Sequence, residues 1–222
     1  MNIFVVIALI LAALEALALH KNWFKLEVVA KPGVMVVLFL WLWTSIGSDG
    51  AAGWFALGSI FSLLGDILLM LSLDRFFLAG LVAFLLAHIF YVIGFNLPLP
   101  EISAWGMLLA VIIGVSGARV IRRILASVIA KGQSRLRIPI AVYGVVISLM
   151  LLSAMLKLTD TTWDAGAALL VSAGAFLFYF SDIILAWNKF VTPITNGRIY
   201  NVAAYHLGQI ALIAGVIVQY SK

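Results

Sequence analysis

The sequence of 222 residues contains no cysteine, and only 10% of its residues are Asp, Glu, Lys or Arg. Without cysteine the chain can form neither a disulfide nor a thiolate nucleophile nor a Cys-ligated metal site. A soluble domain carries about 25% charged residues, so this chain has too few for a surface that faces water on all sides. Polar stretches long enough to form a separate soluble domain are also lacking. The composition therefore predicts a single integral-membrane domain over residues 1–222.

Hydrophobic residues make up 65% of the chain, and the mean hydropathy is +1.19. Apolar runs of about 17–22 residues are long enough to cross a hydrocarbon core of roughly 30 Å. The first run contains Ala16-Leu17-Ala18, which resembles a signal-peptide cleavage site, but it lacks a basic leading region, so we expect a retained helix. We predict an all-α, polytopic membrane protein with eight transmembrane helices at about residues 2–19, 31–47, 51–72, 76–95, 102–120, 138–157, 165–187 and 199–219.

The basic residues are distributed unevenly between the two sides of the predicted helices. Twelve Lys and Arg residues fall after the first, third, fifth and seventh runs, whereas only Lys157 and Lys222 fall on the opposite side. Such an excess marks the cytoplasmic side, so both termini are expected outside the cytoplasm. The expected location is the inner (cytoplasmic) membrane of a bacterium. Segment 119–137 alternates apolar and basic residues at helical spacing and is expected to extend the fifth helix along the inner leaflet.

Two acidic residues lie inside apolar runs in matching surroundings. The stretches "GSIFSLLGDILL" (58–69) and "GAFLFYFSDIIL" (174–185) each place an Asp, Asp66 or Asp182, eight residues after a Gly. The match suggests a four-plus-four parallel repeat with a pseudo-twofold axis along the membrane normal. Short matches between apolar helices also arise by chance, so the repeat remains one of two interpretations.

The ionisable residues inside the helices are expected to share one layer. At 1.5 Å per residue, Asp66 and Asp182 lie about 12 Å and about 10 Å from the cytoplasmic ends of their helices. Glu15 and His206 lie at similar depths, and His88 is deeper by the same count. Helical spacing also puts Tyr91 on the face of His88, and Gln209 on the face of Tyr205.

Polar residues in membrane helices often serve only to hold helices together through hydrogen bonds. That structural interpretation accounts for His88, Tyr91, Tyr205 or Gln209, taken singly, as well as a functional one does. It accounts less well for Asp66 and Asp182, because Asn would serve as a helix lock without the cost of a carboxylate. Two acids in one layer repel if both ionise, so one is expected to keep its proton. An acid and a base at one site are the parts of a hydrolase or a proton-coupled transporter.

Five stretches in order resemble the YhhN-like family of integral-membrane lysoplasmalogenases. They are "AKPG" (30–33), "GDILLM" (65–70), "FLAGLVAFLLAHIFY" (77–91), "FYFSDIILAWNKF" (178–190) and "YHLGQ" (205–209). The resemblance implies an eight-helix enzyme that hydrolyses the vinyl ether of a lysophospholipid taken from the membrane. The products would be a fatty aldehyde and glycerophosphocholine or glycerophosphoethanolamine.

The resemblance also implies roles for individual residues. Asp66 and Asp182 match the acidic positions and are the expected catalytic pair. His206 departs from the family pattern, which would place an aromatic residue beside Tyr205. Lys31, at the expected start of the second helix beside Pro32, would bind the substrate phosphate. The full set of expected substrate-binding residues is Glu15, Lys31, His88, Tyr91, Tyr205, His206 and Gln209.

The chemistry of vinyl-ether hydrolysis suits two carboxyl groups. A carboxylic acid can donate a proton to the alkene carbon, and a carboxylate can stabilise the resulting oxocarbenium ion and activate water. Inverting glycosidases divide the work between two carboxyls in the same way. Asp66, which has fewer polar neighbours in sequence than Asp182 beside Ser181, is expected to be the protonated one. No cofactor, metal or nucleic acid is expected.

An alternative function is a proton-coupled membrane transporter or a lipid flippase that uses the same buried acids. Paired Gly or Pro breaks near both Asp residues would favour transport, and the sequence has none there. The preferred headgroup and chain length and the oligomeric state stay open at this point.

Overall fold

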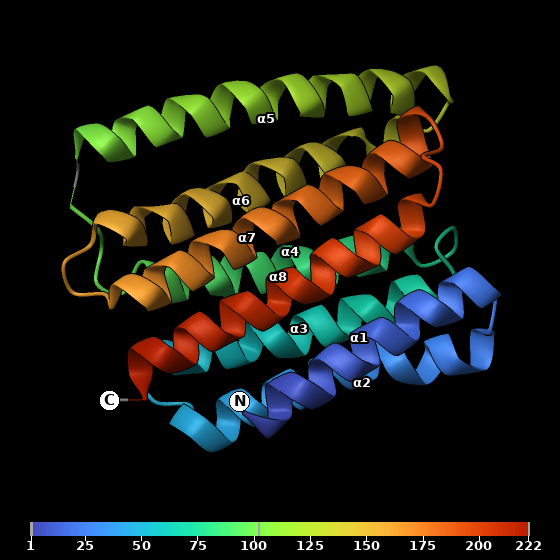
Figure 1. The fold of residues 1–222 in the computed structure, drawn as a ribbon. Helices are drawn as coiled ribbons and strands as arrows, with labels where there is room; N and C mark the ends of the chain where they lie inside the picture. The colour runs from blue at the N-terminus through green and yellow to red at the C-terminus, as the bar shows by residue number, and fades with distance from the viewer. Residues whose placement is uncertain (1, 102, 222) are drawn as a thin grey trace.

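The computed structural model describes residues 2–101 and 103–221, which form an all-helical bundle (Figure 1). Within this described part, eight helices are long and apolar enough to cross a membrane, as predicted. The α-helices are α1 (Ile3–Lys21), α2 (Phe24–Ile46), α3 (Ala51–Leu71), α4 (Phe77–Phe95), α5 (Ala104–Ala130), α6 (Arg137–Met155), α7 (Ala165–Ala186) and α8 (Gly197–Tyr220). Short 3-10 helices η1 (Ser134–Leu136) and η2 (Leu156–Thr159) flank α6, and a short π-helix, η3 (Trp187–Val191), follows α7.

The second helix begins earlier than predicted. Its α-helical backbone starts at Phe24 rather than near residue 31, and Pro32 lies inside it. A proline in a membrane helix removes one backbone hydrogen bond without ending the helix, because neighbouring groups compensate. Glu27 in the first turn complements the positive end of the helix dipole. Lys31 therefore lies inside α2, and the expectation that it begins the helix is wrong.

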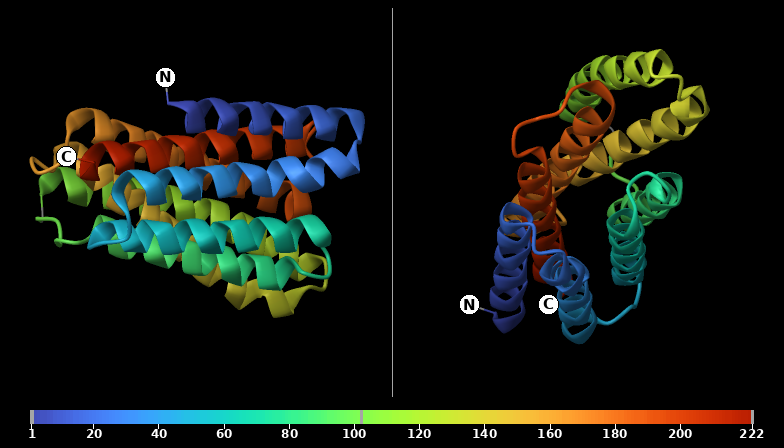
Figure 2. Two further views of the ribbon diagram at one scale, coloured as in Figure 1. Left: turned by 90° about the horizontal axis from the view of Figure 1, so that it is seen from below. Right: turned by 90° about the vertical axis from the view of Figure 1, so that its right-hand side faces the viewer.

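The fifth helix is the longest and extends beyond its predicted apolar run. It continues through the amphipathic segment to Ala130, and Gly132 then adopts a positive φ in the turn before η1. The predicted extension is thus confirmed as far as Ala130; its position relative to the inner leaflet stays a prediction. Figures 1 and 2 show α5 at the outer edge of the bundle, against α6 and η3.

The packing is compatible with two related halves. α3 packs on α4 as α7 packs on α8, and the halves meet through α4 against α6 and α8 against α2. The halves also differ, since α1 covers α8 whereas α5 stays at the edge. The α7–α8 contact is close because glycines line it: a Cβ atom added at Gly174 would lie 2.5 Å from the backbone nitrogen of Leu212.

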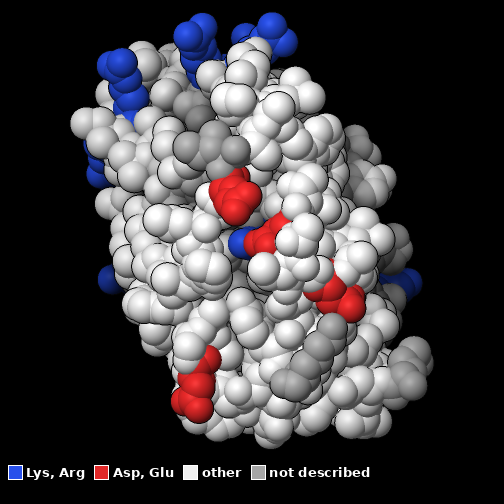
Figure 3. Space-filling view, turned by 90° about the vertical axis from the view of Figure 1, so that its left-hand side faces the viewer, with Lys and Arg blue, Asp and Glu red and all other residues white. Residues whose placement is uncertain are grey.

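The two ends of the bundle differ in charge. The termini and the loops before α3, α5 and α7 lie at one end (Figures 1 and 2). Figure 3 shows acidic side chains on this face. The loops of this end contain Asp49, Glu101, Asp160 and Asp164. In the described loops of this end, the one Lys or Arg is Lys157, which is buried and bonded to Asp160. The basic residues after α1, α3, α5 and α7 lie in the loops of the opposite end or in the helix segments that adjoin them, so the charge asymmetry on which the predicted topology rests is present in the fold.

Candidate active site

Asp66 on α3 is buried and contacts side chains from two other helices. The hydroxyl of Tyr205 on α8 donates a hydrogen bond of 2.7 Å to its Oδ2. The Nζ atom of Lys31 on α2 lies 3.5 Å from its Oδ1, and the Asp66 side chain is only 2% exposed. The positive charge of the ammonium group and the hydrogen bond from the hydroxyl both offset the cost of burying a carboxylate.

Asp182 on α7 has a different set of neighbours. The hydroxyl of Tyr143 on α6 donates a short hydrogen bond to its Oδ2. His88 on α4 places Nε2 at 3.0 Å from the same hydroxyl and 3.7 Å from Asp182 Oδ2. The side chain is 15% exposed, and Ser181 lies 3.4 Å from Oδ1. This carboxyl therefore ends a chain of polar groups that runs from His88 through Tyr143.

The neighbours of Asp66 and those of Asp182 come from corresponding helices of the two halves of the bundle. Each Asp contacts a residue of α2 or α6 in its own half, namely Lys31 or Tyr143. Each also contacts a residue of α8 or α4 in the other half, namely Tyr205 or His88. The correspondence is geometric rather than chemical: a cation stands beside one acid where a neutral hydroxyl stands beside the other.

A cavity of about 440 Å³ joins the two acids inside the bundle. Lys31, Asp66 and Tyr205 line it, as do Asp182 and Glu15. The other lining residues, mostly nearer the end that carries the basic loops, are Phe24, Glu27, Leu69, Met70, Leu73, Phe84, Ser181, Leu185, Asn188, Lys189, Arg198, Asn201 and Val202. The predicted acids thus face one shared space from helices α3 and α7, and that space lies toward the predicted cytoplasmic side.

The basic residues at this cavity are already paired in the structure. Arg198 donates to Glu27 at 2.7 Å, and its own side chain is 68% exposed. Lys189 donates to Asp74 in the α3–α4 loop at 2.6 Å, and this hydrogen bond lowers the pKa of Asp74. Arg198 is therefore the cation at the cavity that remains most open to solvent and to a ligand.

Glu15 and His206 form a second buried pair beside the cavity. Glu15 Oε2 and His206 Nε2 make a short contact between α1 and α8, and both side chains are 0% exposed. Glu15 lines the cavity, whereas His206 lies behind it. This contact explains why a histidine stands where the family pattern would place an aromatic residue. The imidazole of His206 gives the buried carboxyl of Glu15 a polar partner.

Tyr91 and Gln209 lie away from the cavity. The Tyr91 hydroxyl donates to Gln209 Oε1 at 3.3 Å, and Gln209 Nε2 donates to Ser62 Oγ at 3.2 Å. All three side chains are fully buried. These hydrogen bonds connect α4, α8 and α3. Tyr91 and Gln209 therefore have the structural role that the sequence offered as an alternative to a functional one. Their role in substrate binding stays a prediction.

Sequence reasoning missed Tyr143, Glu27 and Asn188 as members of the site. Tyr143 is one tyrosine in an apolar helix, and only its contact with Asp182 distinguishes it from a packing residue. Asn201 shares a face of α8 with Tyr205 by helical spacing, and its side chain donates to the Ser181 carbonyl at 2.8 Å, which connects α8 to the turn of Asp182. Within the described residues, no group of three His, Asp or Glu is placed to hold a metal ion.

Eight apolar helices around an acid-lined cavity define an integral, multi-pass membrane protein with an intramembrane polar site. The model of the YhhN family matches residues 26–216, and the chain belongs to this family, which confirms the resemblance seen in its motifs. No solved structure gives a significant match.

Curated relatives extend the comparison to mammals. The chain is 28% identical to "Lysoplasmalogenase TMEM86B" of Mus musculus over 200 residues, 89% of this chain and 77% of the relative. It is 27% identical to the Homo sapiens protein of the same name over 192 residues, 86% of this chain and 74% of the relative. It is also 27% identical to "Lysoplasmalogenase TMEM86A" of Homo sapiens over 162 residues, 72% and 63% of the two chains.

Proposed function

We propose that this protein is a lysoplasmalogenase, an ether hydrolase that cleaves the vinyl-ether bond of alkenyl lysophospholipids. The observation that carries the proposal is that Asp66 and Asp182, from two different helices, line one cavity inside the membrane-spanning bundle. The names of the curated relatives support the same activity. The products are a fatty aldehyde and glycerophosphocholine or glycerophosphoethanolamine.

The proposed mechanism divides acid and base work between the two carboxyls. One carboxylic acid transfers its proton to the alkene carbon, which leaves an oxocarbenium ion at the carbon bonded to the ether oxygen. The other, as a carboxylate, stabilises this cation and takes a proton from the water that attacks it. The resulting hemiacetal then breaks into aldehyde and alcohol. The cavity of about 440 Å³ is large enough to hold water beside a glycerol backbone.

The substrate is proposed to enter from the leaflet at the basic end of the bundle. Its phosphate would lie near Arg198, which lines the cavity. A guanidinium can bind a phosphate through two parallel hydrogen bonds. Arg198 is largely exposed, so its contact with Glu27 leaves it accessible to the substrate phosphate.

We also propose the inner membrane of a bacterium as the location, which fractionation of the native host's membranes tests.

A proton-coupled transporter or flippase remains the second candidate because a buried acid stands in each half of the bundle. Transporters that bind at the midplane use discontinuous helices there. α3 and α7 are continuous through Asp66 and Asp182, and the irregular backbone of α7 begins only at Trp187. This continuity favours the enzyme. Reconstituted vesicles that move an alkenyl lysophospholipid across the bilayer without releasing aldehyde would favour transport instead.

The direct test of the activity uses purified protein in detergent with an alkenyl lysophospholipid, and it measures free aldehyde. The matched acyl lysophospholipid, which lacks the vinyl ether, should release none. In heavy water, each aldehyde should carry one deuterium on the carbon next to its carbonyl, because the first step protonates that carbon. Aldehyde without this deuterium would contradict the proposed mechanism, and no aldehyde would contradict the proposed function.

A further inference from the structure

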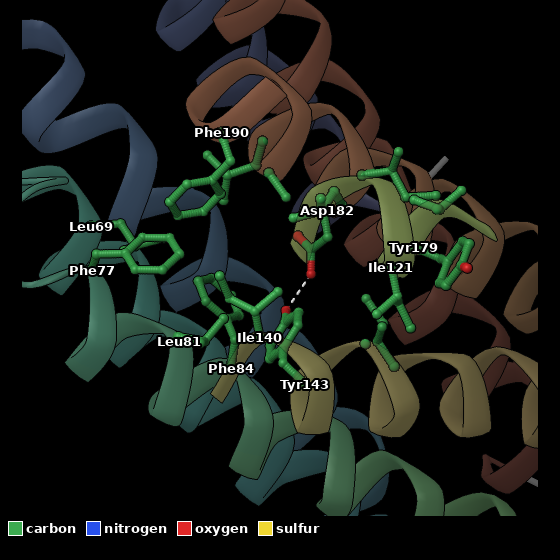
Figure 4. A pocket seen from close by; sticks show the side chains of 17 residues that line it. Leu69, Phe77, Leu81, Phe84, Ile121, Ile140, Tyr143, Tyr179, Asp182 and Phe190 are labelled. Atoms are coloured by element: carbon green, nitrogen blue, oxygen red, sulfur yellow. Dashed lines mark hydrogen bonds between the residues drawn. The ribbon is translucent and has the colours of Figure 1, made fainter. Parts of the chain in front are cut away.

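A second pocket, with an apolar lining, lies on the other side of Asp182 (Figure 4). Its volume is about 70 Å³, several times what one water molecule requires. It lies among α3, α4, α5, α6, α7 and η3, with α5 as its outer wall. Aliphatic and aromatic side chains form it, including Phe77, Leu81, Ile124, Ile140, Ala186 and Phe190.

The apolar pocket and the polar cavity meet at a small set of shared residues. Leu69, Phe84, Asp182 and Leu185 line both spaces. Asp66 lines only the polar cavity. In Figure 4 the carboxyl of Asp182 points at Tyr143, whose ring belongs to the apolar pocket. Asp182 therefore stands at the boundary between a charged space and a hydrocarbon-lined space, whereas Asp66 stands wholly on the charged side.

We propose that the hydrocarbon chain of the substrate begins in this apolar pocket, so that Asp182 donates the proton and Asp66 activates the water. The inference rests on the proposed function and adds to it the direction in which the substrate lies. An alkenyl lysophospholipid changes from polar to apolar at its vinyl ether. A molecule laid across the two spaces places that bond at their boundary, with its headgroup in the polar cavity toward Arg198.

The direction of the substrate decides the roles because the two vinyl carbons are not equivalent. The carbon that accepts the proton is the one on the chain side, and the carbon that becomes cationic is bonded to the ether oxygen. With the chain in the apolar pocket, the first faces Asp182 and the second faces the polar cavity. In the structure the ammonium group of Lys31 lies 3.5 Å from Asp66, whereas the corresponding neighbour of Asp182 is the hydroxyl of Tyr143.

The protons balance within one turnover under this assignment. Asp182 gives its proton to the chain-side carbon as the π electrons form the C–H bond. Water bonds to the ether-side carbon and gives one proton to Asp66. As the hemiacetal breaks, Asp66 returns that proton to the glycerol oxygen, and the hemiacetal hydroxyl gives its proton to Asp182. Both carboxyls regain their starting states without an external acid. The assignment reverses the expectation, drawn from sequence, that Asp66 is the protonated acid.

The role of the apolar pocket in binding the hydrocarbon chain is tested by filling the pocket with a larger side chain. Ala186→Leu adds three carbons to the lining, and Ala126→Leu makes the same change at an exposed position of α5 as a control. The measurement is the ratio of kcat/KM for a long alkenyl chain to that for a propenyl chain with the same headgroup. Ala186→Leu should lower this ratio at least about tenfold, the lower end for one methylene in an apolar pocket. Ala126→Leu should leave it unchanged.

A second variant covers the case in which Ala186→Leu does not fold. Leu81→Ala enlarges the same pocket and should raise kcat/KM for a chain with a methyl branch near the vinyl ether, relative to the straight chain. Suppose that the wild type releases aldehyde and that neither variant changes the kcat/KM ratio measured for it. The hydrocarbon chain would then not lie in the apolar pocket, and the proposed function would still stand. A wild type that releases none from either chain would overturn both.

The roles of the two acids are tested by azide, an anion that can replace a carboxylate but cannot donate a proton. In Asp66→Ala, Asp182 can still protonate the alkene, and azide can add to the oxocarbenium carbon. Substrate loss should then depend on azide and yield the α-azido ether. In Asp182→Ala the proton donor is absent, so azide should have no effect. Rescue of Asp182→Ala alone, of both variants or of neither would overturn the assignment.

Discussion

At the scale of single residues, the cations near Asp66 differ in what they contact. Lys31 lies 3.5 Å from the Asp66 carboxyl, whereas Arg198 is held by Glu27 at the cavity mouth. A group that supports the charge of a reacting carboxylate acts on the chemical step, while a group that holds the headgroup acts equally on bound substrate and transition state. The two substitutions should therefore have separable kinetic effects.

Lys31→Met should lower kcat, because it removes the ammonium group that supports Asp66 in its ionised form, while Arg198→Gln should mainly raise KM. Steady-state kinetics on one alkenyl lysophospholipid measures both. Lys21→Ala, outside the cavity lining, serves as the control and should change neither parameter. If Lys31→Met raised KM alone, Lys31 would be a headgroup contact, as the sequence first indicated, and not a partner of the reacting carboxylate.

The activity should pass through a maximum as pH rises. At low pH the base carboxylate takes up a proton and can no longer activate water; at high pH the acid loses the proton that it must donate. A pH profile of kcat/KM should show two apparent pKa values that belong to the coupled pair. A profile that changes in one direction across the whole range would show that only one titrating group is needed.

Parts of the site could be predicted from sequence, and the reasons are visible residue by residue. Counting residues along the helices placed Asp66 and Asp182 at similar depths, and in the structure both line one cavity. Tyr143 could not be found in this way, because a lone tyrosine in an apolar helix has no periodic signal. The sequence placed Lys31 at the start of α2 because Pro32 was interpreted as a helix start, whereas Lys31 lies inside the helix.

At the scale of elements, the α7–α8 contact positions both halves of the site. Phe178 on α7 packs against His88 and Tyr205, with ring centroids 4.7 Å and 5.1 Å away. Those two side chains serve different carboxyls, so the separation of α7 and α8 affects both. The close approach depends on Gly174, Gly208 and Gly215, where an added Cβ would meet backbone atoms of the facing helix.

Gly174→Ala should destabilise the protein by about 1–3 kcal/mol, the usual cost of overpacking, because its Cβ would press on the backbone of α8. The control is Gly114→Ala on α5, where the added Cβ would meet nothing within 4 Å. Thermal unfolding in detergent should show a lower Tm for the first variant and an unchanged or slightly higher Tm for the second. Equal Tm values would mean that this glycine contact does not hold the helices in place.

The number and order of the helices could be predicted from sequence more reliably than their ends. Apolar length alone identified α3, α4 and α7 within a few residues. The start of α2 and the length of α5 depend on charged and amphipathic segments, where hydropathy gives no boundary. Which helices pack together depends on small side chains such as Gly174, whose partners are set only by the tertiary fold.

At the scale of the whole molecule, the charge difference between the two ends predicts its orientation. A reporter fused to the C-terminus that is active only outside the cytoplasm should be active, and one that is active only inside should not. The reverse result would move the cavity to the other leaflet and change the side from which a lipid enters. Fusions placed in the loop after α5 provide the matched control, with the opposite pattern expected.

The central claim is that Asp66 and Asp182 act as one catalytic pair, and the most direct measurement is aldehyde release by Asp66→Asn and Asp182→Asn. Asn keeps the shape of Asp but can neither donate the proton nor act as a carboxylate. Each variant should fold and lose at least about 10²-fold in kcat, and the double variant should be little worse than the worse single one. A folded single variant with near wild-type aldehyde release would show that its Asp only holds helices together, and would contradict the account.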